Sequence, residues 1–422
     1  MSEIYHQRSD CRLCLSTDMD LAVSMAPIPI ATPNFAIPDT ERNAPVFRTP
    51  VPLDLYLCRD CGLLQVTHVG NPNIQYPNYV YRTSSSLGLA EHFTAYAKEV
   101  IEANALEAGA FVVEIGSNDG TLLKAFKDAG MKVLGIEPAE AVGADARKAG
   151  IDTITDFFSS DVAKQVERDH GKASLVIANN MYANIDELND FTIGVRDLLA
   201  PDGIFVLETQ YGLDVIESLL LDTIYHEHLC YFNVKPIQTF FARLGMQVID
   251  VQRIWTKGGS IRLTTQLDSG KRSVSSNVEA TVTEEIDKGM YQNSTYKAFA
   301  DRISGLRTQL NDMVDAEIES GRSVVGYGSS VGTTTLLAQF GLTEKIAFLF
   351  DDDPTKDPVL SGPGYDLPLI SPDTICDRFP GAVVVFAWRY VDPIKQKNKE
   401  YLKRGGKFIV PLPNITVHQS ND

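Results

Sequence analysis

The chain has 422 residues, 44% of them hydrophobic, and its 38 basic and 55 acidic residues give a formal net charge of −17. This length exceeds what one ordinary core serves, so we expect two or three domains. The negative charge disfavours nucleic acids and anionic membrane surfaces as partners. No stretch approaches the roughly 20 apolar residues of a membrane span, and the start, MSEIYHQRSD, lacks the apolar core of a signal peptide. The expected location is therefore the cytoplasm.

Four of the six cysteines form two CxxC pairs, Cys11 with Cys14 and Cys58 with Cys61. In a reducing compartment such pairs indicate zinc before disulfides, with free or redox-active thiols as the alternative. The surrounding residues 1–70 are rich in proline and poor in helical periodicity, so bound metal would contribute to their folding. We expect these thiolates to hold a structural Zn²⁺, which leaves no open position for chemistry.

A proline- and tyrosine-rich stretch, NPNIQYPNYVYRTSSS, leads into an amphipathic helix expected over about residues 86–105. From residue 111, apolar strands then alternate with helices: FVVEIG, KVLGIEP, SLVIANN, GIFVLE and MQVIDVQ. This alternation predicts a doubly wound parallel sheet. A charged helical segment over about residues 277–320 connects it to a second α/β unit with the strands SVVGYGSS, KIAFLFDDDP, AVVVFAW and KFIVPLP.

The predicted fold class is therefore α/β, in three parts. A small zinc-binding domain occupies residues 1–70, a Rossmann-like domain residues 71–270, and a second Rossmann-like domain residues 271–422. The sequence leaves open whether the protein is a monomer or a homodimer.

The first glycine motif, EIGSNDG, sits at the carboxyl end of the strand FVVEIG, and Glu137 ends the next strand about 20 residues later. A carboxylate there can accept hydrogen bonds from both ribose hydroxyls of NAD or of S-adenosylmethionine. A dinucleotide site would need G-x-G-x-x-G, but here a glycine is missing and Glu114 and Asp119 crowd the turn. Acidic groups repel a pyrophosphate and suit the cationic methyl donor, so S-adenosylmethionine is favoured over NAD; a sheet-packing turn is the remaining alternative.

At the end of the third strand, ANNMYAN places Asn179 and Asn184 at the ligand-binding edge of such a sheet. Their amides can bind an adenine or amino acid group, or can cap a turn. The second glycine motif, GYGSSVG, contains Gly328 and Ser329 and precedes the aspartates at 351–353. It can hold a phosphate or nucleotide, bind NAD, or serve packing alone.

The stretch IYHEHLCYF packs Tyr225, His226, Glu227 and His228 together. It lacks the HExxH spacing of a metalloprotease, and in a strand the two histidines would share one face. Two ligands make a poor metal site, so acid/base chemistry is the favoured interpretation, with a polar loop as the alternative.

In order, CxxC…CxxC, YVYRTSSS, EIGSNDGTLL, GIEPAE, ANN, IYHEHLCYF, GGSIR, GYGSS and VPLPNITV resemble the C-methyltransferases of nucleotide-linked 4-keto-deoxysugars. The resemblance spans nearly the whole chain. It implies a zinc domain, a central S-adenosylmethionine domain and a C-terminal Rossmann-like domain that helps to hold the nucleotide. It also implies that a proton leaves the carbon beside the keto group and that the resulting enolate attacks the methyl group.

The resemblance, with the motifs above, assigns roles to particular residues. His228 is the expected general base, Glu227 its orienting or charge-balancing partner, and Tyr81 and Tyr225 donors to the keto oxygen. The expected donor-binding residues are Gly116, Asn118, Asp119, Glu137, Pro138 and Asn179. The expected substrate-binding residues are Tyr79, Asn184, Arg262, Gly328 and Ser329.

Three positions depart from the family pattern. Asn184 stands where many relatives have a histidine, and an amide cannot take a proton at neutral pH. The second glycine loop reads VGTTTLL where relatives tend to carry a lysine, and Arg389 replaces the usual asparagine. The alternatives are O- or N-methylation of a related small molecule and, in a different class, an NAD-dependent oxidoreductase or a catalytically silent nucleotide-binding protein.

Overall fold

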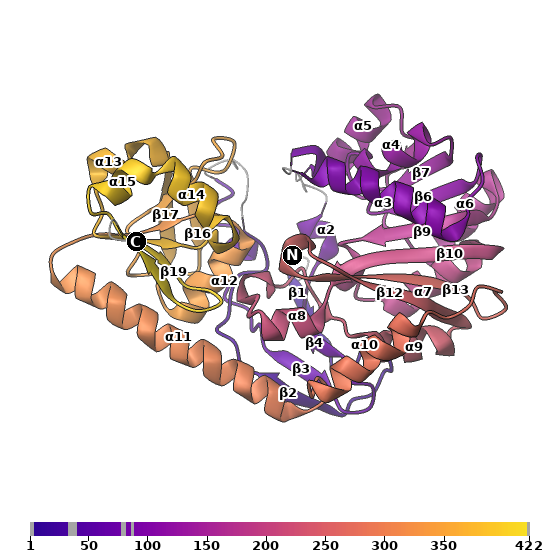
Figure 1. The fold of residues 1–422 in the computed structure, drawn as a ribbon, viewed down its shortest axis with the longest axis horizontal. Helices are drawn as coiled ribbons and strands as arrows, with labels where there is room; N and C mark the ends of the chain where they lie inside the picture. Colours follow the sequence, from indigo (N-terminus) through magenta and orange to yellow (C-terminus); the bar gives the residue numbers. More distant parts are fainter. Residues whose placement is uncertain (1–3, 33–39, 77–81, 86–87, 420–422) are drawn as a thin grey trace.

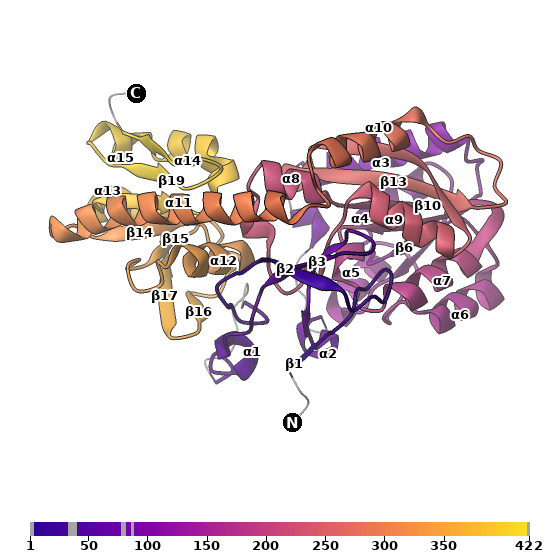
Figure 2. The same ribbon diagram turned by 90° about the horizontal axis from the view of Figure 1, so that it is seen from below.

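The computed structural model of the protein describes residues 4–32, 40–76, 82–85 and 88–419. Two α/β units lie at opposite ends of the molecule, and the N-terminal segment runs beneath and between them (Figure 1). The long helix α11 (Asn293–Glu319) spans from the central unit to the C-terminal one, and it passes beside strand β2 of the N-terminal segment (Figure 2). In the described part of the chain, no helix is both long and apolar enough to cross a membrane.

The N-terminal segment forms an antiparallel sheet that includes a strand from far along the chain. In spatial order its strands are β11 (Cys230–Tyr231), β4 (Leu64–Val66), β3 (Leu55–Cys58) and β2 (Met19–Val23). Beside it, β1 (Tyr5–Gln7) pairs with β5 (His68–Gly70), and two short helices are α1 (Pro45–Arg48) and α2 (Pro72–Gln75). β11 begins two residues after His228, so its pairing with β4 joins the zinc-binding segment to the chain just after the Tyr-His-Glu-His stretch.

The central sheet is α/β but is not wholly parallel. In spatial order its strands are β12 (Met246–Ile254), β13 (Ser260–Leu267), β10 (Leu199–Gln210), β9 (Ala173–Asn179), β6 (Phe111–Ile115), β7 (Lys132–Ile136) and β8 (Thr153–Ile154). The expectation of parallel pairing was wrong for the MQVIDVQ strand, because β12 and β13 are antiparallel neighbours. Their connection is little longer than the 3-10 turn η4 (Thr256–Gly258), too short for a parallel crossover.

Side chains alternate across this sheet and fill two cores. Val112 and Val206 face a core shared with α3 and α4, whereas the next residues, Val113 and Leu207, face the opposite core. The helices of this unit are α3 (Leu89–Asn104), α4 (Thr121–Asp128), α5 (Glu140–Lys148), α6 (Ser160–His170), α7 (Leu188–Leu198), α8 (Gly212–Glu217), α9 (Val234–Arg243) and α10 (Ser276–Asp287). Burial on both faces explains why the parallel strands read as continuous apolar runs.

The C-terminal unit is a second α/β sheet. Its strands, in spatial order, are β16 (Val359–Gly362), β17 (Tyr365–Ile370), β15 (Leu349–Phe350), β14 (Val324–Tyr327), β18 (Ala382–Val385), β19 (Phe408–Val410) and β20 (Thr416–His418). Its helices are α12 (Val331–Phe340), α13 (Ile375–Arg378), α14 (Val391–Lys397) and α15 (Lys399–Lys403). The strands from β17 to β19 are parallel and the two edge pairs antiparallel.

The two α/β units meet at the 3-10 turn η3 (Leu221–Thr223), just before the Tyr-His-Glu-His stretch. The hydroxyl of Thr335 on α12 donates to the carbonyl of Ile224 over 2.8 Å. Arg389 forms an ion pair with Asp222, with 2.7 Å between nitrogen and oxygen. The glycine-loop helix of the C-terminal unit therefore lies directly against the segment that carries the predicted catalytic residues.

Candidate active site

The two CxxC pairs come together as the sequence predicts. The sulfur atoms of Cys11, Cys14, Cys58 and Cys61 all lie within 4.8 Å of one another, and the Cys11–Cys61 and Cys14–Cys58 separations are each 3.5 Å. Zn–S bonds of about 2.3 Å in a tetrahedron require sulfurs about 3.8 Å apart, so the cluster fits Zn²⁺. Contact with Cys61 lowers the pKa of the Cys11 thiol, which favours a thiolate at this position.

The first glycine motif forms a turn between β6 and α4 at the carboxyl edge of the central sheet. Gly116 and Gly120 have positive φ angles of 69° and 77°, which explains the glycines. A Cβ at Gly116 would lie 3.0 Å from the Met181 side chain. Described residues just after Tyr81 cover this turn: the amide of Thr83 donates to Asn118 over 2.8 Å, and the amide of Ser84 to Asp119 over 2.9 Å. Tyr79 and Tyr81 themselves lie outside the described residues.

Buried acidic groups surround the turn. Glu114 is 4% exposed, and burial, together with the nearby Asp119 and Glu137, raises its pKa well above the usual range. Within the described part of the chain, its Oε2 and the Ser117 hydroxyl have no hydrogen-bond partner. A cationic ligand would relieve the repulsion between these carboxyl groups, so the turn fits the ammonium and sulfonium groups of S-adenosylmethionine.

Glu137, at the end of β7, is held by the backbone. Its two oxygens accept hydrogen bonds from the amides of Asn118 and Ala139 over 3.0 and 2.9 Å. A carboxylate has about four acceptor positions, so these bonds leave capacity for ribose hydroxyls. Pro138 follows in the same turn. At the end of β9, the Oδ1 of Asn179 accepts from the amide of Glu208, while its Nδ2 is buried without a partner among the described residues.

The Tyr-His-Glu-His stretch is a turn and not a strand, and its two histidines make different contacts. The amide of His228 donates to the carbonyl of Tyr225, and this closes the turn. His226 is 1% exposed, and its ring nitrogens lie 3.3 Å from the carbonyl oxygens of His68 and Val51. His226 thus packs the turn against the N-terminal segment, and a metal site shared with His228 is excluded by this geometry.

His228 has a defined tautomer. Its Nδ1 lies 2.8 Å from the carbonyl oxygen of Thr223, which can only accept, so Nδ1 carries the proton. Nε2 is then an acceptor and lies 3.1 Å from the Tyr225 hydroxyl. Burial lowers the pKa of His228 to about 4, and the nearby Lys257 lowers it further. The imidazole is therefore neutral at physiological pH and able to accept a proton at Nε2.

Glu227 and Lys257 form an electrostatic pair that the sequence did not reveal. Burial raises the pKa of Glu227 to about 7, and the positive charge of Lys257 opposes this shift. Lys257 adopts a left-handed backbone conformation, with φ 55° and ψ 21°, which is costly for a residue with a side chain. Lys257 is followed by Gly258 and Gly259. This glycine pair could have indicated a constrained loop from the sequence.

Asn184 lies in the 3-10 turn η2 (Tyr182–Asn184), close to the Tyr-His-Glu-His turn. It hydrogen-bonds the hydroxyl of Tyr76, whose pKa is raised by burial and by the nearby Glu227. The Asn184 Oδ1 is buried and has no partner in the described ranges. Asn184, Tyr76 and Glu227 thus lie together, and Tyr76 was not among the predicted site residues because its tyrosine-rich stretch offered several equivalent candidates.

Arg262 does not have the free side chain that substrate binding requires. It is 4% exposed, forms ion pairs with Glu208 and Glu99 at 3.0 and 2.9 Å, and lies 4.0 Å from the ring centre of Tyr96. The expectation of a direct substrate contact is corrected on this ground. On β13, which the sequence did not predict as a strand, the side chain packs between β10 and α3.

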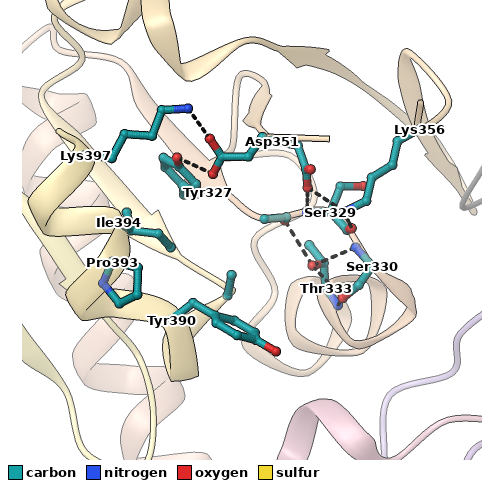
Figure 3. Close-up of a pocket in the computed structure, with 13 residues that line it drawn as sticks. Tyr327, Ser329, Ser330, Thr333, Asp351, Lys356, Tyr390, Pro393, Ile394 and Lys397 are labelled. Carbon is teal, nitrogen blue, oxygen red and sulfur yellow. Dashed lines mark hydrogen bonds and ion pairs between the residues drawn. The ribbon is translucent and has the colours of Figure 1, made fainter. Parts of the chain in front are cut away.

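The second glycine loop lines a cavity of about 410 Å³ in the C-terminal unit (Figure 3). The amide of Ser329 donates to Asp351 over 2.7 Å, and Lys356 binds both Asp351 and the Ser329 carbonyl. Lys397 contacts Asp352 at the same cavity. Gly328 has φ 100°. A carboxylate already lies at the loop amide, so a dinucleotide pyrophosphate would meet negative charge there.

Two of the three departures from the family pattern meet at Asp222. A Cβ at Gly332, within the glycine-loop segment VGTTTLL, would lie 2.4 Å from the Asp222 carbonyl oxygen, so a larger residue cannot fit without movement. The carboxylate of the same aspartate holds Arg389. The sequence predicted no cation near this loop, but the fold brings Lys356 and Lys397 to the cavity and Arg389 to Asp222.

Comparison with known proteins agrees with this arrangement. Family profiles match consecutive parts of the chain: a zinc binding domain over residues 11–76, a methyltransferase domain over residues 89–251 and a C-methyltransferase C-terminal domain over residues 255–413. With the thiolate cluster and the acidic donor turn, these matches define the class as an S-adenosylmethionine-dependent methyltransferase with a structural zinc site.

The C-methyltransferase NovU of Streptomyces niveus is 32% identical over 418 residues, which cover 99% of this chain and 98% of NovU. The chain belongs to this C-methyltransferase family. Among solved structures, magnesium protoporphyrin IX methyltransferase from Synechocystis PCC 6803 with bound SAM gives a TM-score of 0.33 at 15% identity, covering 42% of this chain and 79% of that one. The PH0226 protein of Pyrococcus horikoshii OT3 gives 0.37 at 14% identity, covering 44% and 94%.

Proposed function

We propose that this C-methyltransferase methylates the carbon beside the keto group of a nucleotide-linked deoxysugar, through an enolate formed at the Tyr-His-Glu-His turn. The observation that carries this proposal is the geometry of His228, whose proton-free Nε2 lies beside the Tyr225 hydroxyl. We further propose that residues 1–70, 71–270 and 271–422 act as zinc-binding, methyl-donor and nucleotide-binding domains, in a cytoplasmic protein with reduced thiols.

In this proposal Nε2 of His228 takes the proton from the carbon next to the carbonyl. The low pKa keeps the imidazole available, and ionised Glu227 stabilises the imidazolium that forms. The Tyr225 hydroxyl, with Tyr81 as a second donor, and the charge of Lys257 stabilise the negative oxygen of the enolate. S-adenosylmethionine supplies the electrophilic methyl group to the carbon.

The cavity at the second glycine loop is the proposed site for the nucleotide. It is lined by two aromatic side chains, Tyr327 and Tyr390, and by the cations Lys356 and Lys397. Aromatic rings can pack against a base, while the lysines and the amino end of α12 can bind phosphate oxygens. Because Asp351 already accepts from the Ser329 amide, the nucleotide phosphates in this proposal contact Lys356 and Lys397 rather than this loop amide.

The test is incubation with S-adenosylmethionine labelled at the methyl group and a panel of nucleotide-linked ketosugars. We expect a product whose labelled methyl group is bound to carbon. Separately, with S-adenosylhomocysteine in D₂O, the substrate should exchange the proton beside its keto group, and His228→Asn should abolish the exchange. Methyl transfer without any exchange in the wild-type protein would contradict an enolate formed before transfer.

A further inference from the structure

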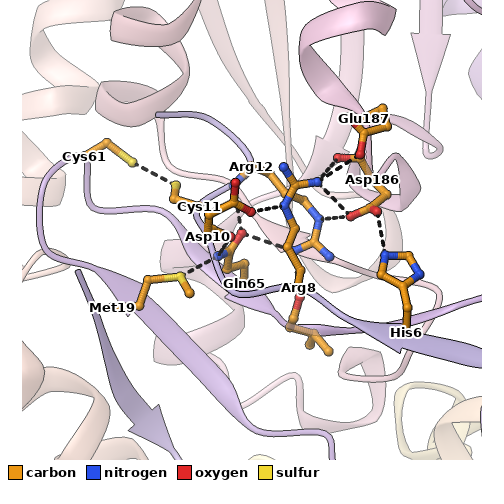
Figure 4. A network of polar contacts seen from close by, with 11 residues as sticks. His6, Arg8, Asp10, Cys11, Arg12, Met19, Cys61, Gln65, Asp186 and Glu187 are labelled. Atoms are coloured by element: carbon orange, nitrogen blue, oxygen red, sulfur yellow. Dashed lines mark hydrogen bonds and ion pairs between the residues drawn. The ribbon is translucent and has the colours of Figure 1, made fainter. Parts of the chain in front are cut away.

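Arg12 lies between the zinc ligands Cys11 and Cys14, and its side chain points away from the sulfur cluster into the protein (Figure 4). It is 0% exposed. The Nε atom donates to Asp186 over 2.9 Å, and one terminal nitrogen donates to the Val66 carbonyl over 2.6 Å. A zinc ion that fixes the two cysteines would also fix the backbone from which this guanidinium extends.

The carboxylate of Asp186 contacts several basic side chains of the N-terminal segment. Besides Arg12, Arg8 lies 3.2 Å and His6 3.1 Å from its carboxylate, and Arg8 also donates to its backbone carbonyl (Figure 4). Asp186 follows closely after η2, the turn that carries Asn184. The zinc-binding segment is therefore tied to the turn that holds a predicted substrate-binding residue.

The same guanidinium supports the other side of the site. Leu229, directly after His228, donates its amide to the carbonyl of Ala183 in η2 over 2.8 Å and accepts from the amide of Val66 over 2.9 Å. Arg12 holds the carbonyl of Val66 and, through Asp186, the end of η2. Both backbone partners of Leu229 thus converge on one buried arginine.

The second zinc knuckle offers an internal comparison. Arg59 occupies the same place between Cys58 and Cys61 as Arg12 does between its cysteines. Its side chain is 59% exposed, and its contacts with Asp18 and Asp20 are long, at 3.9 and 3.6 Å. Exposed pairs of this kind contribute little. Both knuckles have the pattern Cys-Arg-x-Cys. Of their two arginines, Arg12 contacts the segment next to the candidate active site and, among the described residues, Arg59 does not.

We infer that Arg12 is a positioning residue, through which the zinc-bound knuckle sets the placement of Asn184 and His228 for reaction. Zinc then has a second role besides folding the N-terminal segment, because it fixes the backbone that carries Arg12. The inference rests on the proposed function for the role of His228, but its structural part can be measured without any substrate.

The experiment compares Arg12→Met with Arg59→Met in the full-length, zinc-loaded protein. Hydrogen exchange should become about tenfold faster at the amides of residues 183–186 and 228–231 in Arg12→Met and stay unchanged in Arg59→Met. Zinc content should stay at one per chain, and affinity for S-adenosylhomocysteine should be retained in both. Equal exchange at these amides in both variants and the wild type overturns the inference.

Kinetics separate positioning from general damage. A displacement of about 1 Å costs about 10²-fold in rate, so kcat should fall by that order in Arg12→Met, and Arg12→Lys should recover part of it. Loss of S-adenosylhomocysteine binding alongside kcat would indicate a damaged fold and would overturn a positioning role. If Arg12→Met does not fold, Asp186→Asn should give the same local exchange pattern. Full activity in His228→Asn would instead refute the proposed function and leave the exchange result standing.

Discussion

The hydroxyl of Tyr225 lies 3.1 Å from Nε2 of His228, while Nδ1 of the same ring donates to the Thr223 carbonyl. The contact with the Thr223 carbonyl sets the direction of the Tyr225 hydrogen bond. A carbonyl oxygen can only accept, so the proton is on Nδ1 and Nε2 is the acceptor. The tautomer needed for proton abstraction is thus set by the backbone of η3, against which the C-terminal α12 packs through Thr335. Both α/β units therefore contribute to the state of one imidazole.

His228→Asn is expected to lower kcat by about 10²- to 10⁴-fold, the range usual for general base catalysis. The proposed donor site lies at the β6–α4 turn, so affinity for S-adenosylhomocysteine, measured by calorimetry, should be unchanged. The exposed His170→Asn serves as the control. Retention of wild-type kcat by the His228 variant would remove this residue from the mechanism.

In the proposed mechanism the Glu227 carboxylate balances the charge of protonated His228, so the activity should rise through about pH 7, the pKa of Glu227. A profile of kcat against pH should lose this limb in Glu227→Gln and reach a lower plateau. Lys257 lowers the pKa of Glu227, so Lys257→Gln should move the limb to higher pH. A limb that stays at the same pH in both variants would assign it to another group.

Glu227 also makes stability depend on pH. Its carboxyl titrates near 4.5 when exposed and near 7 in the fold, so between these values the folded state binds more protons than the unfolded state. The free energy of unfolding should therefore fall as pH rises through this window. Denaturant unfolding of wild type and Glu227→Gln should show a difference that grows towards pH 7, and a constant difference would contradict the raised pKa.

Glu137→Ala should weaken S-adenosylhomocysteine binding by at least about tenfold, since the variant loses the proposed acceptors for the ribose and the bonds to the amides of Asn118 and Ala139. Calorimetry measures this directly. Glu140→Ala is the matched control, because this neighbouring carboxylate is exposed and pairs only with Arg147 among the described residues. Equal affinity in the two variants would place the donor elsewhere.

Removal of zinc by a chelator should lower the thermal midpoint and release one metal ion per chain, measured by elemental analysis. The binding free energy of such a metal is part of the folding free energy of the segment that holds it. Cys14→Ser should give the same loss, whereas Cys376→Ser, outside the cluster, should not. An unchanged midpoint after complete metal removal would contradict a structural role.

Lys397→Gln should weaken binding of nucleoside diphosphates several-fold, because a lysine at the cavity of the second glycine loop pairs with phosphate charge. Affinity for S-adenosylhomocysteine should be unaffected. Lys403→Gln, on the neighbouring α15, is a suitable control at an exposed position. A nucleoside that binds as tightly as its diphosphate would show that the cavity does not contact the phosphates.

Local patterns predicted much of the molecule. The apolar runs before EIGSNDG and GYGSS gave the strands β6 and β14, and CxxC spacing gave a cluster that fits zinc, because these signals depend on neighbours along the chain. The prediction was wrong where pairing depended on distant partners. The MQVIDVQ strand runs antiparallel, and Arg262 is buried against Glu208 because β13 lies between β12 and β10.

The sequence by itself determined the cysteine cluster that fits zinc and the two nucleotide-type folds, and it predicted the Tyr-His-Glu-His stretch as an acid/base group, because each signal lies in residues close together in the chain. Only the tertiary structure separated His226, which packs against the N-terminal segment, from His228, whose Nε2 is an acceptor. It alone brought Arg12 to Asp186 and Lys257 to Glu227. The physical reason is that burial, tautomer and pKa depend on atoms contributed by segments far apart in the chain.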